Sequence, residues 1–314
     1  MRLVFMGTPD FAVPSLRKLA EQHEVVAVVT APDRPAGRGK KLQNPAVKVA
    51  AEELGIPVLQ PERLKDAAFL SHLESLDASL FVVVAFRMLP RQVWSMPHKG
   101  TINLHASLLP AYRGAAPINW AIINGERETG LSTFFIDEKI DTGAVIEQVK
   151  LGIGPDENAG NLHDRMMQLG AGLLLNTVNR IEANEVKSVN QTDMPEYSAE
   201  ALPDAPKIFR DDCRVKWQNK AQEVHNHIRG LSPYPGAFAH CAALDSDFKL
   251  LHSAITTRPS IGEAGSIHVE EGKLYVDTLD KQIEIIELQA PGKRRMPTSD
   301  FLRGFQFPNA SRFS

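Results

Sequence analysis

The sequence predicts an α/β fold with a mostly parallel sheet, followed by a small barrel of antiparallel strands. In the first half of the chain, apolar runs of strand length alternate with segments whose apolar residues recur at helical spacing, an order typical of a parallel sheet. In the last third, the runs are short, β-rich and bounded by turn residues, as in small barrels. The length of 314 residues exceeds that of most single domains, so we expect two domains.

Each expected element of the first half rests on one of these patterns. Apolar runs predict strands at 2–6, 24–30, 79–86 and 101–105, and a hairpin-like pair at 130–137 and 144–151. Helical patterns occur near 11–21, 46–54, 66–75 and 115–123, and a long amphipathic helix is expected over 158–182. We assign these elements to one domain, 1–189.

The second half begins after a segment without a sustained period. Residues 190–212 mix three prolines with polar and acidic residues, which is typical of a linker. We place the linker at 190–205 and the second domain at 206–314. The β-rich runs of that domain are 236–242, 248–256, 265–270, 273–278 and 282–289.

Composition argues against several classes of protein. The chain has no run of 18 apolar residues and no N-terminal leader pattern, so we expect a soluble protein of the cytoplasm. The two cysteines, Cys213 and Cys241, lack the C-x-x-C spacing of zinc or thiol-exchange sites. The net charge is -3, with +2 on residues 206–314 (15 Lys+Arg against 13 Asp+Glu) and -5 on the rest (20 against 25). A polyanionic partner would therefore have to be bound by local patches.

The first strand and its turn do not favour a nicotinamide site. Gly7 stands alone in MGTPDFAVPS, where the dinucleotide motif G-x-G-x-x-G needs three glycines, and Pro14 suits the start of a helix. A tight strand-to-helix turn explains this segment. Open α/β sheets nevertheless bind ligands at the carboxyl ends of their strands.

Three polar residues alternate where the strand 101–105 ends. Asn103, His105 and Ser107 should share one face of an extended strand. The Asn amide and the imidazole could stabilise developing oxygen charge, and the imidazole could also carry a proton. Asp141, in the turn KIDTG, could set the charge of His105 and pass protons, whereas the strand alternation already explains the rival acid, Asp137.

The alternative is a strand end whose polar groups are simply satisfied. Ser107 is a poor candidate for a hydrolase nucleophile, because no G-x-S-x-G elbow surrounds it. The following loop, SLLPAYRGAAP, favours a functional site, since a long apolar loop between a buried strand and a helix is costly unless it packs against something.

At these residues the chain resembles the folate-dependent formyltransferases. Members share Asn-x-His followed by Ser-Leu-Leu-Pro, here within 103–110, then the residues at 112–118, and Asp-Thr-Gly, here 141–143. Three further stretches are similar to the members that formylate a charged tRNA: FMGTPDFA (5–12), PDRPAGRGKKL (32–42) and RGAAPI (113–118). The resemblance covers nearly the whole chain, including a C-terminal domain that ends in PGKRRM (291–296).

The resemblance implies a Rossmann-like formyltransferase domain and an OB-like β-barrel domain. The implied reaction moves a formyl group from 10-formyltetrahydrofolate to the free α-amine of initiator methionyl-tRNA, without a metal. Asn103 and His105 would act on the oxyanion, and Asp141 in orientation and proton transfer. The residues that would line the folate pocket are Ser107, Leu108, Leu109, Pro110, Phe86, Arg87, Met88 and Leu89.

Four positions depart from the residues common in the family. Ala106, Ala111 and the pair Phe86 and Arg87 bear on the shape of the folate loop, and Arg87 could pair with the glutamate tail of the folate. None of them belongs to the Asn, His and Asp set.

Local basic patches bear on the choice of acceptor. Residues 34–48 hold five positive side chains and no acid. Most charge runs are solvated surface loops, but a glycine-containing basic loop at the sheet edge could hold the phosphates of an acceptor stem. The expected RNA contacts are Arg34, Arg38, Lys40 and Lys41, with Arg38 the most specific, and Lys293, Arg294 and Arg295 of the barrel.

Two alternative functions stay open from the residues alone. A formyltransferase for a small amine, such as a purine precursor or amino sugar, would need neither the basic loop nor the barrel. A non-enzymatic RNA-binding module would explain the basic patches but not the polar trio. His225 and His227 do not predict a metal centre, because positions i and i+2 of a helix diverge. We expect a monomer.

Overall fold

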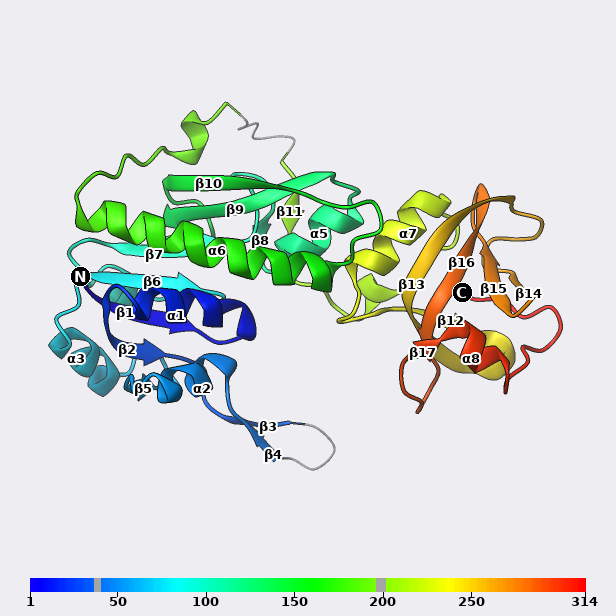
Figure 1. Cartoon of the computed structure of the whole chain (residues 1–314), viewed down its shortest axis with the longest axis horizontal. Coiled ribbons are helices and arrows are strands. Elements are labelled where there is room, and N and C mark those ends of the chain that lie inside the picture. The colour runs from blue at the N-terminus through cyan, green and yellow to red at the C-terminus, as the bar shows by residue number, and fades with distance from the viewer. Residues whose placement is uncertain (37–40, 196–201) are drawn as a thin grey trace. The chain divides into compact units, whose positions relative to one another are not determined.

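The computed structural model describes residues 1–36, 41–195 and 202–314, which form two compact units (Figure 1). The first unit comprises residues 1–114, 130–151 and 163–204, and the second comprises 115–129, 152–162 and 205–314. The second unit therefore contains two segments that come from the first half of the sequence.

The first unit is built on a seven-stranded sheet with the order β10-β9-β7-β6-β1-β2-β5. These strands are β1 (Arg2–Gly7), β2 (Glu24–Val29), β5 (Val58–Leu59), β6 (Leu80–Val84), β7 (Thr101–His105), β9 (Glu128–Phe135) and β10 (Val145–Gly152). Pairing is parallel from β5 to β7, and β9 is antiparallel to β7. The expected mostly parallel sheet is confirmed, and the sheet becomes antiparallel where β9 pairs with β7.

Helices cover both faces of this sheet. They are α1 (Val13–Ala20), α2 (Ala46–Glu53), α3 (Ala67–Ser75), α4 (Arg91–Trp94) and the long α6 (Ala159–Glu182). Gly170 of α6 packs against Leu104 and Leu131, so α6 covers the face of β7 opposite to that of Asn103 and His105. On the other face, Val83 of β6 shares a hydrophobic cluster with α3 and α4. The two faces bury different residues of the same strands, which explains their continuous apolar runs.

Most elements expected in the first half are present within a few residues. The expected strand 79–86 stops at Val84, because Ala85 adopts a left-handed backbone conformation with φ +48°. Among the described residues, the short strand β5 was not expected, nor were two short pairs: β3 (Arg34–Ala36) pairs with β4 (Lys41–Gln43), and β8 (Arg113–Gly114) pairs with β11 (Asp204–Ala205). The segment expected to be a linker contains the short helix η2 (Gln191–Asp193), preceded by a bridge between Val189 and Val145.

The second unit contains an antiparallel sheet with the order β12-β13-β16-β15-β14, and β17 pairs with β16. Its elements are α5 (Pro117–Ile123), α7 (Ala221–Gly230), β12 (Ala237–Cys241), β13 (Ser246–Pro259), β14 (Ile267–Glu270), β15 (Lys273–Asp277), β16 (Lys281–Gln289), β17 (Met296–Pro297) and α8 (Thr298–Leu302). Phe313 bridges Cys241 and Arg312 bridges Ser266, so the segment 311–314 links the two edges of the sheet. The C-terminal antiparallel β domain is confirmed.

The helix α7 joins the barrel to the two segments from the first half of the sequence. Asn119 of α5 donates its side-chain amide to the Gly230 carbonyl at 2.8 Å. The buried Arg229 guanidinium donates to the carbonyls of Gly154 and Glu157, at 3.2 and 2.9 Å. A buried charge needs such partners. These contacts make α5 and the segment 152–158 integral parts of the second unit.

Candidate active site

The strand β7 carries Asn103 and His105 to the carboxyl edge of the sheet. Asn103 lies between Val83 of β6 and Phe134 of β9 in the strand register. His105 is the last residue of the strand and is only 6% exposed. The half-buried Asn103 side chain has no hydrogen-bond partner among the described residues. An amide in this position keeps two N–H donors for a ligand.

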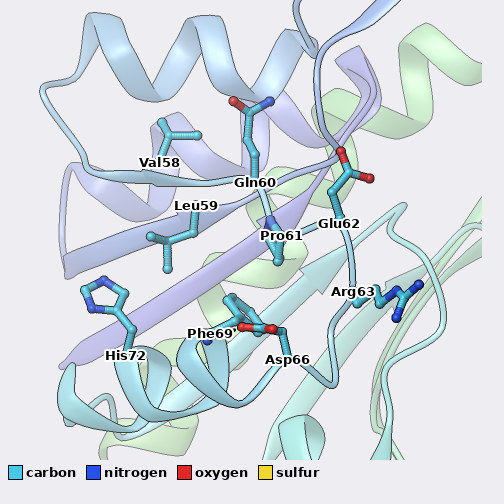
Figure 2. A pocket seen from close by; sticks show the side chains of 9 residues that line it. All are labelled: Val58, Leu59, Gln60, Pro61, Glu62, Arg63, Asp66, Phe69 and His72. Atoms are coloured by element: carbon cyan, nitrogen blue, oxygen red, sulfur yellow. Dashed lines mark hydrogen bonds between the residues drawn. The ribbon is translucent and has the colours of Figure 1, made fainter.

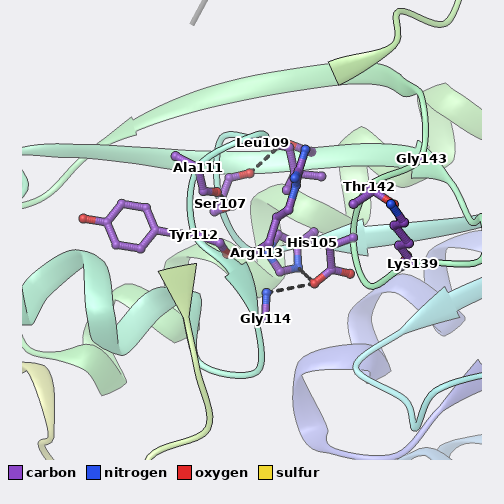
Figure 3. Close-up of polar contacts among 12 residues, drawn as sticks. His105, Ser107, Leu109, Ala111, Tyr112, Arg113, Gly114, Lys139, Thr142 and Gly143 are labelled. Atoms are coloured by element: carbon purple, nitrogen blue, oxygen red, sulfur yellow. Dashed lines mark hydrogen bonds and ion pairs between the residues drawn. The ribbon is translucent and has the colours of Figure 1, made fainter. Parts of the chain in front are cut away.

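The His105 ring lies between a carbonyl and a carboxylate. Its Nε2 is 2.8 Å from the carbonyl oxygen of Tyr112, and its Nδ1 is 3.7 Å from Oδ2 of Asp141. Because a carbonyl only accepts hydrogen bonds, Nε2 carries a proton and donates it. Nδ1 is therefore the ring nitrogen that can exchange a proton beside Asp141. Figure 3 shows His105 beside Gly114 and below the loop that carries Ser107 and Tyr112.

The turn after β9 delivers Asp141 and not Asp137 to the imidazole. Asp137 accepts hydrogen bonds from the Lys139 amide at 3.1 Å and the Thr142 hydroxyl at 2.7 Å. Its carboxylate therefore stabilises the turn that contains it. Asp141 has a left-handed backbone with φ +55°, and its Oδ2 accepts the Gly114 amide at 2.9 Å. A non-glycine residue in this conformation is strained and is often found at functional sites.

The loop after β7 is fixed by hydrogen bonds from the neighbouring strands. The Ser132 hydroxyl donates to the Ser107 carbonyl at 2.7 Å and accepts the Leu109 amide at 3.0 Å. Gln148 donates to the Leu109 carbonyl at 2.8 Å. Ser107 is fully buried and donates its own hydroxyl to the Ala111 carbonyl at 2.7 Å. The Ser107 hydroxyl therefore stabilises the loop itself.

The apolar side chains of this loop are directed into the first unit. Leu109 is 2% exposed and clusters with Phe134 and Val145. Leu108 is half-buried and packs against Gly130, and Pro110 is buried. Tyr112, whose carbonyl accepts from His105, has a left-handed backbone with φ +59°, as Asp141 does. The predicted folate loop thus presents mainly its backbone and the half-buried Leu108.

The predicted opposite wall, residues 86–89, follows the neighbouring strand β6. Arg87 donates from Nη1 to the Glu62 carbonyl at 3.1 Å and from Nη2 to the Pro61 carbonyl, and burial lowers the pKa of its guanidinium. Phe86 lies beneath that guanidinium, 5.6 Å from its carbon. Met88 is 66% exposed, whereas Leu89 is buried. The charge of Arg87 is therefore directed to the backbone of 61–62.

A surface pocket of about 410 Å³ lies beside these two carbonyls (Figure 2). Its lining runs from Val58 to Arg63 and includes Asp66, Phe69 and His72. None of these residues is among the predicted site residues. The carboxylate of Asp66 caps α3 by accepting the Phe69 amide at 3.1 Å, so it has a structural role there.

The predicted RNA contacts are dispersed. Arg34 is exposed at the start of β3, Lys41 begins β4, and Arg38 and Lys40 fall outside the described residues. In the second unit, Lys293 and Arg294 are exposed, whereas Arg295 pairs with Glu287 at 2.5 Å, which raises the pKa of Arg295. In the structure, Glu287 therefore partly neutralises the charge of Arg295.

One residue with a direct role in this geometry could not be recognised in the sequence. Gln191, which is 2% exposed, bonds to the Arg113 side chain and to the backbone of the Asp141 turn. It lies in a segment of polar residues without periodicity, so no pattern distinguishes it from its neighbours.

Comparison with known proteins defines the class. The formyl transferase family model matches residues 1–178, and the model of the formyl transferase C-terminal domain matches residues 207–306. An N-formyltransferase from Helicobacter canadensis, solved with folinic acid and dTDP-3-aminofucose, has a TM-score of 0.65 at 20% identity, covering 92% of this chain and 98% of its own. HypX from Aquifex aeolicus, solved with tetrahydrofolic acid, has a TM-score of 0.64 at 16% identity, covering 100% of this chain and 51% of its own. These two structures share the fold. Because the family model covers more than half of the chain, the protein is a member of the formyl transferase family.

Curated relatives narrow the class further. The chain is 47% identical to the methionyl-tRNA formyltransferase of Bacteroides thetaiotaomicron, over 98% of this chain and 96% of the relative. It is 49% identical to that of Porphyromonas gingivalis, over 97% of this chain and 96% of the relative. The chain therefore belongs to the methionyl-tRNA formyltransferase family.

Proposed function

We propose that the protein transfers the formyl group of 10-formyltetrahydrofolate to the α-amine of initiator methionyl-tRNA, which gives N-formylmethionyl-tRNA for translation initiation. The family assignment supports this reaction. The observation that carries the chemistry is the buried His105 Nδ1, which lies 3.7 Å from Asp141 Oδ2 and on the same strand as the half-buried Asn103 amide. We place the enzyme in the cytoplasm, as a monomer. Among the described residues, no helix is long and apolar enough to cross a membrane.

In this reaction the amine nitrogen bonds to the formyl carbon, and the bond from that carbon to N10 of the folate breaks. The amine loses one proton and N10 gains one. The Asn103 amide would donate to the oxygen that becomes negative, as an oxyanion-hole donor does. His105 and Asp141 would hold the proton in transit at Nδ1, while the Tyr112 carbonyl keeps the ring oriented through Nε2.

The donor would bind where the carboxyl ends of β6 and β7 meet. The strands pair in parallel with Val84 opposite Leu104, so the segments 86–89 and 107–110 leave the same edge of the sheet. The backbone of the fixed 107–110 loop and the exposed Met88 side chain would then contact the pterin ring.

The tRNA would be bound through phosphates by Arg34, Arg38, Lys40 and Lys41, and by Lys293, Arg294 and Arg295 of the barrel. Lys48, the fifth basic residue of the loop region, pairs with Asp33 at 2.6 Å, and this bond lowers the pKa of Asp33. Lys48 thus contributes to the base of the loop and not to its free charge.

The deciding experiment supplies 10-formyltetrahydrofolate with either methionyl-tRNA or small amines, including an amino-sugar nucleotide and a purine precursor. We expect formylation of methionyl-tRNA and no transfer to the small amines. Transfer to a small amine without transfer to methionyl-tRNA would refute the proposed acceptor. Binding of tRNA without any transfer would favour a non-enzymatic RNA-binding module.

A further inference from the structure

We propose that Gln191 is a positioning residue for formyl transfer, because its side-chain amide clamps the Arg113 loop to the turn that carries Asp141. This inference rests on the proposed function. Within the described part of the chain, the Gln191 side chain bonds to Arg113 and to the backbone of Asp141 and Gly143, and not to His105 or the Asp141 carboxylate. It acts on the backbone that holds them.

The amide of Gln191 uses all of its hydrogen-bonding capacity. Its Oε1 accepts two hydrogen bonds from the Arg113 guanidinium, from Nε at 2.9 Å and from Nη2 at 2.5 Å. Its Nε2 donates to the carbonyls of Asp141 and Gly143, at 2.8 and 2.9 Å. A primary amide has two acceptor lone pairs and two N–H donors, so none is left over. Because Arg113 can only donate and the two carbonyls can only accept, the oxygen of the Gln191 amide must face Arg113 and its nitrogen must face the carbonyls.

The backbone around Gln191 gives the clamp a rigid base. Val189 and Val145 exchange two backbone hydrogen bonds of 2.8 Å, which fixes the chain beside the start of β10. The helix η2 then begins at Gln191, whose side chain is buried. If the buried amide lost these partners, its N–H and C=O groups would be buried without hydrogen bonds, which would destabilise the folded state.

The two loops that Gln191 joins are those that surround His105. The Arg113 loop supplies the Tyr112 carbonyl to Nε2, and the other turn supplies the Asp141 carboxylate to Nδ1. One further bond connects them, from the Gly114 amide to Asp141 Oδ2 at 2.9 Å. Tyr112 and Asp141 both have strained, left-handed backbones, which persist only when neighbouring contacts enforce them. Loss of the clamp should let both loops relax away from the imidazole.

The test compares Gln191→Leu, Gln191→Glu and Asn190→Ala with the unsubstituted protein. Leucine has a similar size and no hydrogen bonds. Glutamate retains the acceptor for Arg113 but presents oxygen to the Asp141 and Gly143 carbonyls. Asn190 is the exposed preceding residue, and its side chain bonds to the side chain of Asp193 at 3.3 Å, away from the Asp141 turn, so Asn190→Ala is the matched control.

We expect kcat for methionyl-tRNA formylation to fall about 10- to 100-fold in both Gln191 variants, with KM for both substrates changed less than about threefold, as misplacement of catalytic groups by an ångström predicts. Amide hydrogen exchange should become faster in 111–114 and 139–143 in these variants, and both readouts should be unchanged in Asn190→Ala. Assays are made below the melting temperature of every variant. A kcat within twofold of the unsubstituted protein, or a loss confined to KM, would overturn the proposal.

The exchange measurement separates this inference from the proposed function. If the unsubstituted protein fails to formylate methionyl-tRNA, the proposed function is wrong, whatever Gln191 does. If it formylates methionyl-tRNA but exchange in the two loops is unaffected by Gln191→Leu, the clamp is refuted while the function stands.

Discussion

The α-carbon of Gly143 packs directly against the backbone carbonyl of Phe135, so that a β-carbon on residue 143 would stand 1.7 Å from that oxygen. No side chain fits at this distance, and the obstacle is backbone, which cannot rotate away. Gly143 therefore closes the turn between β9 and β10 and sets where Asp141 lies relative to His105.

Substitution Gly143→Ala should displace this turn. We expect a loss of about 1–3 kcal/mol in the free energy of unfolding, the usual cost of overpacking, together with a loss of kcat. Gly172→Ala is the matched control, because this α6 glycine has open space around it and alanine is preferred in helices by about 1 kcal/mol. Chemical denaturation of both variants measures the difference, and equal stabilities would contradict the argument.

Removal of the imidazole should abolish transfer without affecting tRNA binding. For His105→Ala we expect kcat to fall roughly 10²- to 10⁴-fold, the range of acid–base contributions. Binding of methionyl-tRNA, measured by filter retention, should stay within twofold. Parallel loss of tRNA binding would show that His105 serves the fold or the acceptor site and not the chemistry.

The basic loop should act on the tRNA and not on the folate. We expect Arg38→Ala to raise KM for methionyl-tRNA and to reduce the dependence of log K on log salt concentration by about one, as loss of one phosphate contact does. The dissociation constant of the folate should not change. Lys187→Ala, at an exposed lysine after α6, serves as the control. An altered folate affinity with unchanged tRNA use would reverse the assignment.

The second unit should lose stability in mild acid through His225. Burial, and next the charge of Arg229, hold the pKa of His225 below its ordinary value of 6.5, although Asp156 opposes this. Between the folded and the unfolded pKa, the unfolded chain binds more protons, so stability falls as the pH is lowered through 6.5 toward the folded pKa. His225→Gln should therefore show a smaller decrease in melting temperature between pH 7.5 and 5.5. Parallel pH curves for the two proteins would argue against this role.

Regular periodicity explains which parts of the fold could be predicted. The helix expected over 158–182 has apolar residues at helical spacing along much of its length, and the strand expected at 101–105 alternates apolar and polar residues. The structure places them at Ala159–Glu182 and Thr101–His105. The helix α4 and the strand β5 span four and two residues, which is too short for a period to be recognised. Their positions depend on packing against the rest of the sheet.

In the candidate site, the sequence allowed only those residues to be proposed whose side chains suit the chemistry and whose positions follow from the strand pattern. Asn103, His105 and Asp141 could be proposed because an alternating strand and a turn bring them to one sheet edge. The hydroxyl of Ser107 finds its partner within the irregular loop itself, at Ala111, and the amide of Gln191 finds its partner on a distant segment, at the Asp141 turn. Such hydrogen bonds leave no periodic trace, so the sequence does not distinguish these residues from ordinary loop residues.

The path of the chain through the second unit limits how the protein can be divided. A fragment that starts at residue 206 would lack α5 and the segment 152–158. It would therefore lose Asn119, which bonds to the Gly230 carbonyl, and the carbonyls of Gly154 and Glu157, which accept from Arg229. Ile123, which packs against the hydrophobic cluster of the barrel, would also be missing. A barrel fragment expressed alone should therefore expose apolar surface and tend to aggregate. Chimaeras with related enzymes would need to exchange the three stretches 115–129, 152–162 and 205–314 together.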